Sequence, residues 1–474
     1  MCGICGIIDN NREIDKEILI RMRDALSHRG PDDAGVYIDN GSSPFVGLAH
    51  RRLSIIDLTS AGHQPMSNED ASIWIVFNGE IYNFKELNKE LIEKGHKFKS
   101  HTDSETIIHL YEEYAEECVD YLRGMFAFVI WDKKRGQLLA ARDRFGKKPL
   151  LYSQDSTRLC FASEFLSLTE SGVIKKEINE EALHYYLSFG YIPSPLTIYK
   201  NVFMLPPAHR LLLKNNQIKV ERYWQLDYSH KLEITENEAA REVLRLIEES
   251  VKVRLYSDVA LGAFLSGGID SSIIVALMSR LSGKRVKTFS IGFEESAYNE
   301  LDFAKKIATA YNTEHHEFIL KPKAMDILPQ LVEHYGQPYA DSSCIPTYYV
   351  SQETRKFVTV ALNGDGGDEL FAGYERYQAM LISEFYHRVP IAFRNILQNF
   401  SKMLPDSLDQ KNRLRNIKRF FQAIDLPLEE RYLRWIGIFD AKQKESLYSQ
   451  NFKEKVANSN PLGLLSPYLS LIHI

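Results

Sequence analysis

Cysteine is scarce in this sequence of 474 residues. The five that occur are Cys2, Cys5, Cys118, Cys160 and Cys344. Their number is odd, and neither a second cysteine pair nor a nearby histidine accompanies Cys2 and Cys5. This spacing argues against a zinc site and against a disulfide framework. We therefore expect free thiols, as in a protein of a reducing compartment.

Long apolar and long basic segments are also missing. No apolar run reaches the length of a membrane helix, and the N-terminus lacks the basic region and cleavage site of a signal peptide. The formal net charge is −5 and no long block of Lys or Arg occurs, which argues against nucleic acid as the main partner. These absences predict a soluble cytoplasmic protein that works without a membrane or nucleic acid.

The first ten residues, MCGICGIIDN, place a cysteine directly after the initiator Met1. One interpretation is an edge strand with two buried thiols, at Cys2 and Cys5, because isoleucines are spaced by small residues. The other is that Met1 is removed, so that Cys2 becomes the first residue and carries both a thiol and a free α-amine.

A chain of this length predicts two or more domains with separate cores. Strand patterns occur in PFVGLAH, SIWIVFNGE, MFAFVIWD and QLLAARD, with a hairpin turn joining the last two. Helical patterns occur in NFKELNKELIEKG and SETIIHLYEEYAEECVDYLRG, each ending in a glycine that suits a C-cap. The Pro-rich segment from Pro193 to Pro207 then favours a linker.

Beyond the linker, two polar hairpin-like strands and a long amphipathic helix from Asn237 lead into the alternating strands and helices of a parallel α/β domain. Val259–Leu265 reads as a buried strand and Ser271–Leu281 as a helix, with SGGID between them. Gly267 and Gly268 let backbone N–H groups approach an anion, and the helix N-terminus adds its dipole. The loop lacks the lysine of a Walker sequence. It is either an ordinary turn or a phosphate cradle, and its polar and glycine positions favour the cradle.

A second glycine-rich loop, NGDGGDE, follows a predicted strand at Phe357–Leu362. Its carboxylates, Asp365, Asp368 and Glu369, would repel one another unless a cation lay among them. The loop is either a solvated acidic turn or a Mg²⁺ site, and a nearby phosphate cradle favours Mg²⁺. Asp270 is the natural second carboxylate, because strands of one parallel sheet end at the same edge.

Taken in order, MCGICGI, HRGPDD, RRLSIID, FNGEIYN, RDRFGKKPL, SGGIDSS and NGDGGDE resemble the glutamine-dependent asparagine synthetase family. The resemblance covers the chain to about Tyr377. It implies a class II glutamine amidotransferase domain with the αββα sandwich of N-terminal nucleophile hydrolases, then a parallel-sheet α/β domain of the ATP-pyrophosphatase type. The implied boundaries are 2–205 for the glutaminase, 206–236 for a linker and hairpin, and 237–474 for the synthetase.

The resemblance also implies roles in the glutaminase half. Cys2, freed by removal of Met1, would be the nucleophile and its own α-amine the base, since such an amine has a pKa of about 7.7–8.0. Asn78 and Gly79 would form the oxyanion hole. The glutamine-binding residues would be Arg52, Leu53, Ser54, Ile55, Asn78, Gly79, Glu80 and Asp103, with Arg52 on the α-carboxylate and the two acids on the α-amino group. Without the resemblance, an ion pair, a hairpin turn and a helix N-cap would account for Arg52, Asn78–Glu80 and Asp103.

In the synthetase half the resemblance implies ATP and Mg²⁺. The ATP-binding residues would be Leu265, Ser266, Gly267, Gly268, Asp270, Ser271, Ser272, Ile291, Asn363 and Gly364. Asp270 and Asp368 would hold Mg²⁺, and Asp365 would act catalytically beside an acyl-adenylate. The expected small-molecule substrates are glutamine, aspartate and ATP, with ammonia crossing an internal passage and a homodimer as a candidate assembly.

The sequence departs from the family pattern near its end. An ARxPFLD-like stretch and a later Lys-containing segment are not found, and the last residues read LLSPYLSLIHI. This predicts a synthetase domain that is incomplete at its C-terminus. The predicted function is glutamine-hydrolysing asparagine synthesis. The alternatives are amidation of another carboxylate and a remnant with glutaminase activity only, while the retained Cys2, Asn78 and Glu80 disfavour a β-lactam-type synthetase.

Overall fold

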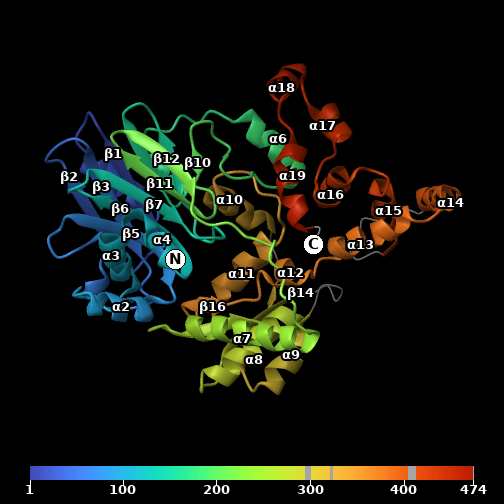
Figure 1. Ribbon diagram of the computed structural model, residues 1–474, viewed down its shortest axis with the longest axis horizontal. Helices are drawn as coiled ribbons and strands as arrows, with labels where there is room; N and C mark the ends of the chain where they lie inside the picture. Colours follow the sequence, from blue (N-terminus) through green and yellow to red (C-terminus); the bar gives the residue numbers. More distant parts are fainter. Residues whose placement is uncertain (294–299, 321–323, 404–412, 473–474) are drawn as a thin grey trace. The chain divides into compact units, whose positions relative to one another are not determined.

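The computed structural model describes residues 1–293, 300–320, 324–403 and 413–472. The chain forms two compact units. The first comprises Met1–Asn179 and Pro193–Asn363, and the second comprises Glu180–Ile192 and Gly364–Ile474. Figure 1 labels their helices and strands. Among the residues described, no helix combines the length and the apolar character that crossing a membrane requires.

Two six-stranded antiparallel sheets build the N-terminal part of the first unit (Figure 1). Their strand orders are β10-β8-β9-β1-β3-β2 and β12-β11-β7-β6-β5-β4. The first sheet contains β1 (Gly3–Asp9), β2 (Asp33–Asp39), β3 (Phe45–Arg52), β8 (Leu151–Gln154), β9 (Arg158–Ala162) and β10 (Phe203–Met204). The second contains β4 (Met66–Ser67), β5 (Ile73–Ile81), β6 (Gly124–Asp132), β7 (Gln137–Arg142), β11 (His209–Lys214) and β12 (Gln217–Arg222).

Successive strand residues point to opposite sides of a sheet, and both faces of each sheet are covered. Between the sheets, Ile4 and Leu48 of the first pack with Val76 and Val129 of the second. The other face of the first sheet packs on α1 (Lys16–Asp24) and α5 (Phe165–Glu170). The other face of the second packs on α2 (Phe84–Glu93) and α3 (Asp103–Tyr114). This layering confirms the predicted αββα sandwich.

The strands predicted from PFVGLAH, SIWIVFNGE, MFAFVIWD and QLLAARD are confirmed as β3, β5, β6 and β7. The single helix predicted through SETIIHLYEEYAEECVDYLRG is wrong. Ala115 has a φ of +49°, which ends α3; a short 3₁₀ turn, η2 (Ala115–Glu117), and α4 (Cys118–Tyr121) follow. The hairpin after the Pro-rich segment extends the second sheet, because β11 pairs with β7.

A four-stranded parallel sheet of order β15-β14-β13-β16 forms the rest of the first unit. Its strands are β13 (Leu261–Phe264), β14 (Lys287–Phe293), β15 (Glu314–Leu320) and β16 (Val360–Leu362). The helices in this part are α7 (Glu236–Arg254), α8 (Ile269–Leu281), α9 (Leu301–Ala310), α10 (Ala324–Tyr335) and α11 (Cys344–Thr354). The parallel α/β pattern is confirmed, with β13 and β16 shorter than predicted and α8 starting two residues earlier, after Gly268 as its N-cap.

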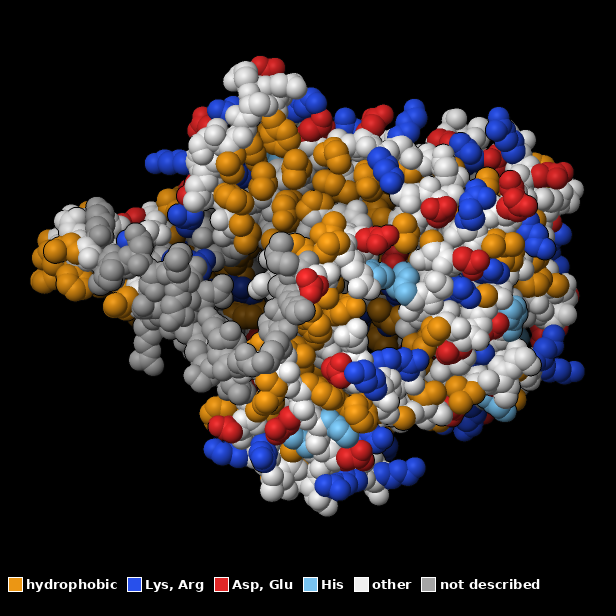
Figure 2. All heavy atoms as spheres, turned by 180° about the vertical axis from the view of Figure 1, so that it is seen from behind, with side chains coloured by type: hydrophobic (Ala, Val, Ile, Leu, Met, Phe, Trp, Pro, Cys, Tyr) orange, Lys and Arg blue, Asp and Glu red, His pale blue; other side chains and the backbone are white. Residues whose placement is uncertain are grey.

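Helices make up the second unit. They are α6 (Glu180–Phe189), α12 (Gly367–Phe371), α13 (Glu375–His387), α14 (Ile391–Lys402), α15 (Arg413–Ala423), α16 (Leu428–Ile436), α17 (Ala441–Leu447), α18 (Gln450–Lys455) and α19 (Pro461–Ile472). Met380, Tyr432 and Leu469 form a small core. Figure 2 shows apolar side chains gathered over α14, where Phe393 and Phe400 are exposed.

A candidate glutaminase pocket and a candidate nucleotide cleft

A small cavity of about 60 Å³ lies where β1, β3, β5 and α3 meet. The sequence-predicted residues that line it are Cys2, Arg52, Leu53, Ile55, Asn78, Gly79, Glu80 and Asp103. Ser54 is not in the wall; its backbone N–H donates to Asp32 Oδ2 at 2.8 Å. The fold thus brings together residues from four segments that lie far apart in the sequence.

The thiol of Cys2 is held against the start of the loop after β3. The N–H of Leu53 lies 3.5 Å from Cys2 Sγ, and the thiol lies 3.7 Å from the Leu53 carbonyl oxygen. Burial raises the pKa of the Cys2 thiol, while the Leu53 N–H and the charges of Lys148 and Arg52 act to lower it. A thiol in this setting needs a base to become a nucleophile at neutral pH.

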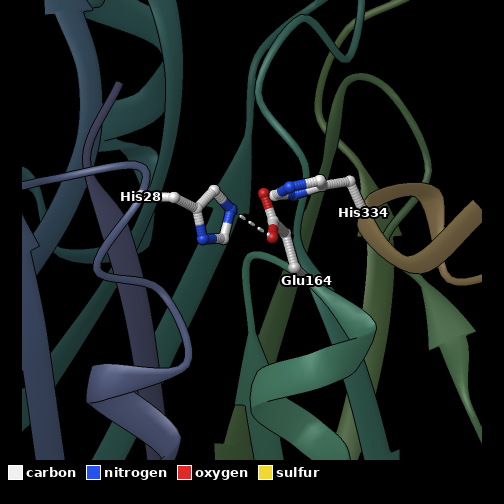
Figure 3. A group of neighbouring side chains, drawn as sticks. All are labelled: His28, Glu164 and His334. Carbon is white, nitrogen blue, oxygen red and sulfur yellow. Dashed lines mark hydrogen bonds and ion pairs between the residues drawn. The ribbon is translucent and has the colours of Figure 1, made fainter. Parts of the chain in front are cut away.

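The backbone of Cys2 is fixed by Arg29. Arg29 Nε donates to the Cys2 carbonyl oxygen at 2.9 Å, and Arg29 Nη1 donates to Glu164 Oε1 at 2.6 Å. The second oxygen of Glu164 bonds to His28 Nε2 at 2.9 Å, as Figure 3 shows. Glu164 therefore positions Arg29, and Arg29 positions the backbone of Cys2.

Asn78 and Gly79 lie near the end of β5, paired with Ala127 and Phe126 of β6. The Asn78 side chain is 1 % exposed, yet neither its Oδ1 nor its Nδ2 has a hydrogen-bond partner among the described residues. Buried polar atoms are normally paired, so this amide is available to a bound molecule. A Cβ on Gly79 would lie 2.3 Å from the Met125 carbonyl oxygen, so only glycine fits there.

Glu80 and Asp103 put two carboxyl groups on the cavity wall. Burial, with a smaller contribution from the charge of Glu80, raises the pKa of Asp103 to about 7, although the Ile81 N–H donates to Asp103 Oδ2 at 2.8 Å. Burial also raises the pKa of Glu80. Within the described chain, neither carboxyl forms an ion pair within 4.0 Å, which leaves a site suited to an ammonium group.

The two adjacent arginines at the end of β3 point to different surroundings. Arg52 is buried in the cavity wall; its Nη1 donates to the Thr59 carbonyl oxygen at 3.0 Å, and its Nη2 donates to those of Ile56 at 3.2 Å and Asp57 at 2.5 Å. Arg51 instead lies 3.4 Å from Asp24. Because a guanidinium has five N–H donors, Arg52 keeps donors for a ligand.

The cavity also has wall residues that the sequence did not single out. They are Met1, Ile56, Gln64, Phe77, Thr102, Ser104, Met125 and Lys148. Lys148 is notable because burial lowers its pKa while it faces Cys2 and Glu80. It stands in the RDRFGKKPL segment, but nothing in that pattern shows which of its charged residues is buried.

A larger cavity of about 220 Å³ lies at the carboxyl ends of β13 and β14. Three of the predicted ATP-binding residues, Leu265, Ser266 and Ile291, line it beside Phe289 and Ala304. Gly267, Gly268, Asp270, Ser271 and Ser272 follow in the loop and first turn of α8 but are not in its wall.

Hydroxyl groups close the SGGID loop on itself. Ser266 Oγ lies 2.9 Å from Ser271 Oγ, the Gly268 N–H donates to Ser266 Oγ at 3.2 Å, and Ser272 Oγ donates to the Gly268 carbonyl oxygen at 2.7 Å. Gly267 has a φ of +81°, and a Cβ there would lie 2.6 Å from the Ala304 nitrogen. The loop can take this shape only with glycine at 267.

The NGDGGDE loop is divided between the two units, since Asn363 ends one segment of the first unit and Gly364 begins a segment of the second. Asp368 and Glu369 lie in the first turn of α12, and the Tyr374 hydroxyl donates to Glu369 Oε1 at 2.7 Å. Asp270 belongs to the first unit and both Asp365 and Asp368 to the second. The predicted pairing of these carboxylates stays a prediction.

Comparison with known proteins adds independent findings. Residues 1–224 match the family described as "Glutamine amidotransferase domain", and residues 242–462 match "Asparagine synthase". The chain is 38 % identical over 455 residues to "Asparagine synthetase [glutamine-hydrolyzing] 1" of Bacillus subtilis, covering 94 % of this chain and 69 % of that relative. It is 40 % identical over 410 residues to "Putative asparagine synthetase [glutamine-hydrolyzing] 2" of Methanocaldococcus jannaschii, covering 82 % and 79 %. The chain therefore belongs to the family of glutamine-hydrolysing asparagine synthetases.

Proposed function

We propose that the Cys2 pocket hydrolyses glutamine and that the ammonia released amidates the β-carboxylate of aspartate, activated by ATP at the parallel sheet. The observation that carries the glutaminase assignment is one cavity that joins the Cys2 thiol, the unpartnered Asn78 amide and the unpaired acids Glu80 and Asp103. The family match favours asparagine as product over another amide. It also disfavours the alternative of a glutaminase remnant.

Glutamine would be held by its two charged α-substituents. Arg52 binds the α-carboxylate with its uncommitted donors, and Glu80 and Asp103 bind the α-ammonium. The opposite signs of these groups orient the side-chain amide toward Cys2. Leu53 and Ile55 supply apolar wall between the charged ends.

Hydrolysis would follow from the thiolate of Cys2. Its sulfur attacks the amide carbon, Asn78 Nδ2 and the Gly79 N–H donate to the oxyanion, and the C–N bond breaks as ammonia leaves with a proton from the base. Water then cleaves the thioester to give glutamate and the free thiol. The base is the α-amine that Cys2 gains when Met1 is removed. A free α-amine has an ordinary pKa of about 7.7–8.0, so it can accept the thiol proton near neutral pH.

The synthetase site would place ATP along the loop from Leu265 to Ser272, with Ile291 beside the base or ribose and Asn363 and Gly364 near the nucleotide. Mg²⁺ belongs to this proposal, and hard carboxylate oxygens such as those of Asp270 and Asp368 fit it. When bound, Mg²⁺ neutralises phosphate charge. Asp365 is proposed to act next to the acyl-adenylate, and ammonia to reach it by an internal passage.

A split assay with the full chain tests the proposal. Cys2→Ala should lower glutamate formation by at least about 10⁴-fold, while ammonium, aspartate and Mg-ATP still give asparagine and AMP. Cys344→Ala, which changes a thiol outside the pocket, is the control. Glutamate formation that survives in Cys2→Ala would disprove the nucleophile. Asp270→Asn and Asp368→Asn should weaken Mg-ATP binding, and unchanged affinity in both would disprove the metal assignment.

The remaining expectations stay predictions: the boundaries at 205 and 236, the cytoplasmic location and the homodimer. Size-exclusion chromatography with light scattering would test the dimer, and limited proteolysis would test the boundaries.

A further inference from the structure

Two histidines and a glutamate meet where the end of α2 faces α3. Gly95, with a φ of +103°, ends α2, and the His96 N–H bonds back to the Leu91 carbonyl oxygen at 3.0 Å. This turn directs the chain toward α3. His109 and Glu112 lie three residues apart on α3, hence on one face of the helix. The cluster is separate from the cavity that Cys2 lines.

Three donor atoms form a tight triangle. His109 Nδ1 lies 2.7 Å from Glu112 Oε2, His96 Nδ1 lies 3.3 Å from the same oxygen, and the two Nδ1 atoms lie 3.2 Å apart. Ligands that each lie about 2.0–2.2 Å from a zinc-class ion are separated by about 2.9–3.5 Å in octahedral or tetrahedral geometry. The three donor–donor distances are therefore close to the distances between the ligands of such an ion.

Hydrogen bonds alone leave this arrangement poorly satisfied. One carboxylate oxygen faces both Nδ1 atoms, and a proton on each nitrogen would place two N–H groups against each other. A cation in front of the triangle would instead accept three lone pairs. His109 is 1 % exposed, so its Nδ1 is shielded from bulk water.

The surroundings hold the three donors in place and carry negative charge. Asn68 Nδ2 donates to the other Glu112 oxygen at 2.9 Å, and His96 Nε2 bonds to Glu113 Oε1 at 3.0 Å. Glu105 Oε1 lies 3.8 Å from His109 Nε2. Glu113 thus takes the place of the carboxylate that usually bonds to the outer nitrogen of a ligating histidine, whereas Glu105 at 3.8 Å adds negative charge without a hydrogen bond.

A second cluster of the same composition lacks these features. His28, Glu164 and His334 also lie close together (Figure 3), but Arg29 Nη1 donates to Glu164 at 2.6 Å. A guanidinium there repels a cation and already neutralises the carboxylate. Both histidines of that cluster are exposed, whereas the α2–α3 cluster has a buried one.

We propose that His96, His109 and Glu112 bind one divalent cation of the zinc class, Zn²⁺, Co²⁺ or Ni²⁺, and so tie the end of α2 to α3. Imidazole nitrogens with one carboxylate suit these ions, whereas Mg²⁺ prefers oxygen ligands only. The site is structural in kind, and it stabilises the helix whose first residue is Asp103.

Titration of the full chain with Co²⁺ after chelator treatment tests this. The background is Cys2→Ala, so that the pocket thiol does not contribute, and the buffer contains excess Mg²⁺. We expect one equivalent to bind, with visible d–d absorption, and the thermal midpoint to rise. His96→Gln, which changes a partly exposed ligand, should weaken Co²⁺ binding more than about tenfold and abolish the thermal shift. Glu112→Gln should act in the same direction.

His334→Gln is the matched control, because it removes one exposed histidine from the Arg29-neutralised cluster, and it should bind Co²⁺ as the background does. If His334→Gln abolishes binding and His96→Gln does not, the cation lies at the other cluster and the proposal fails. It also fails if the chain binds no Co²⁺ in the presence of Mg²⁺, since the triangle is then only a hydrogen-bonded network.

Discussion

The two candidate sites of the first unit differ in how completely the apo chain has built them. The Cys2 pocket is small, about 60 Å³, and its polar groups are buried on strands and on the first turn of a helix. The cavity at the parallel sheet is about 220 Å³, and Ser266 and Gly268 beside it are exposed in a loop. Two stacked sheets can direct side chains into a site from the middle of their strands. A parallel sheet instead builds a site from the loops that follow its strands. The proposed glutaminase site is therefore pre-arranged, and the proposed nucleotide site depends on the conformation of the loop.

The largest effect on synthesis is expected from a substitution in the SGGID loop. Gly267→Val places side-chain atoms where a Cβ already lies 2.6 Å from the Ala304 nitrogen, at a φ of +81°. Asparagine formation from ammonium and Mg-ATP should fall to background, while glutamate formation stays within about twofold.

Gly283→Ala is the matched control for that change. Gly283 also has a positive φ, +62°, at the other end of α8, but no atom lies within 4 Å of a Cβ there. Normal synthesis in Gly267→Val would show that the loop is not part of the nucleotide site.

Asn78→Ala should remove one of the two proposed hydrogen-bond donors to the oxyanion. Loss of one oxyanion donor lowers kcat by about 10²–10³-fold with little change in KM. Steady-state glutamate formation measures this, with Asn88→Ala on α2 as a control amide outside the cavity. An effect on KM alone would assign Asn78 to ground-state binding.

The proposed role of Asp103 predicts that glutamine binding depends on pH. Burial raises the pKa of Asp103 to about 7, and only its carboxylate form attracts the α-ammonium, so KM for glutamine should fall as pH rises from about 6 to about 8. Asp103→Asn should raise KM about tenfold and remove this pH dependence. Asp120→Asn, an exposed carboxylate on α4, should preserve it. A pH dependence of KM that persists in Asp103→Asn would locate the titrating group elsewhere.

The smallest effect is expected from Glu164, which supports the backbone of Cys2 through Arg29. Burial alone would raise the pKa of Glu164, but His28 and Arg29 together lower it. The stabilisation is thus present above the ordinary Glu pKa and is lost as pH falls through the lowered value. Glu164→Gln should lower the free energy of unfolding by about 1–2 kcal/mol in urea titrations at neutral pH, and the difference should vanish in acid.

Glu170→Gln removes a surface pair with Arg21 at 3.8 Å, with side chains 54 % and 42 % exposed. It should change stability by less than about 0.5 kcal/mol. Equal effects of the two substitutions would show that Glu164 does not act through Arg29.

Prediction from sequence succeeded where a local pattern decides the structure. Strand β5 could be predicted because β-branched and aromatic residues run from Ile73 to Phe77, before Asn78 and Gly79. The loop before α8 could be predicted from the sequence because two glycines follow an apolar strand. The helix break at Ala115 was missed, since nothing in the local apolar spacing signals a positive φ at an alanine.

Burial and neighbours chosen by the tertiary fold could not be read in this way. Lys148 enters the pocket from a segment that reads as a charged turn, and Gln64 does so from a loop. His96 and His109 are separated by a helix end and a loop, so neither attracts attention until the fold places their Nδ1 atoms 3.2 Å apart.

The close backbone approaches around the pocket have a consequence for a saturation-mutagenesis map of this chain. A Cβ at Gly79 would lie 2.3 Å from a backbone oxygen, and one at Gly62 would lie 1.9 Å from Arg52 Nη2. Gly62 has no assigned role in binding or catalysis, and the role proposed for Gly79 uses only its backbone N–H, yet alanine at either should be tolerated less well than most substitutions of charged surface residues. Glycines would therefore stand out in such a map beside Cys2, because a Cβ at either position would collide with Met125 or Arg52, which both line the cavity.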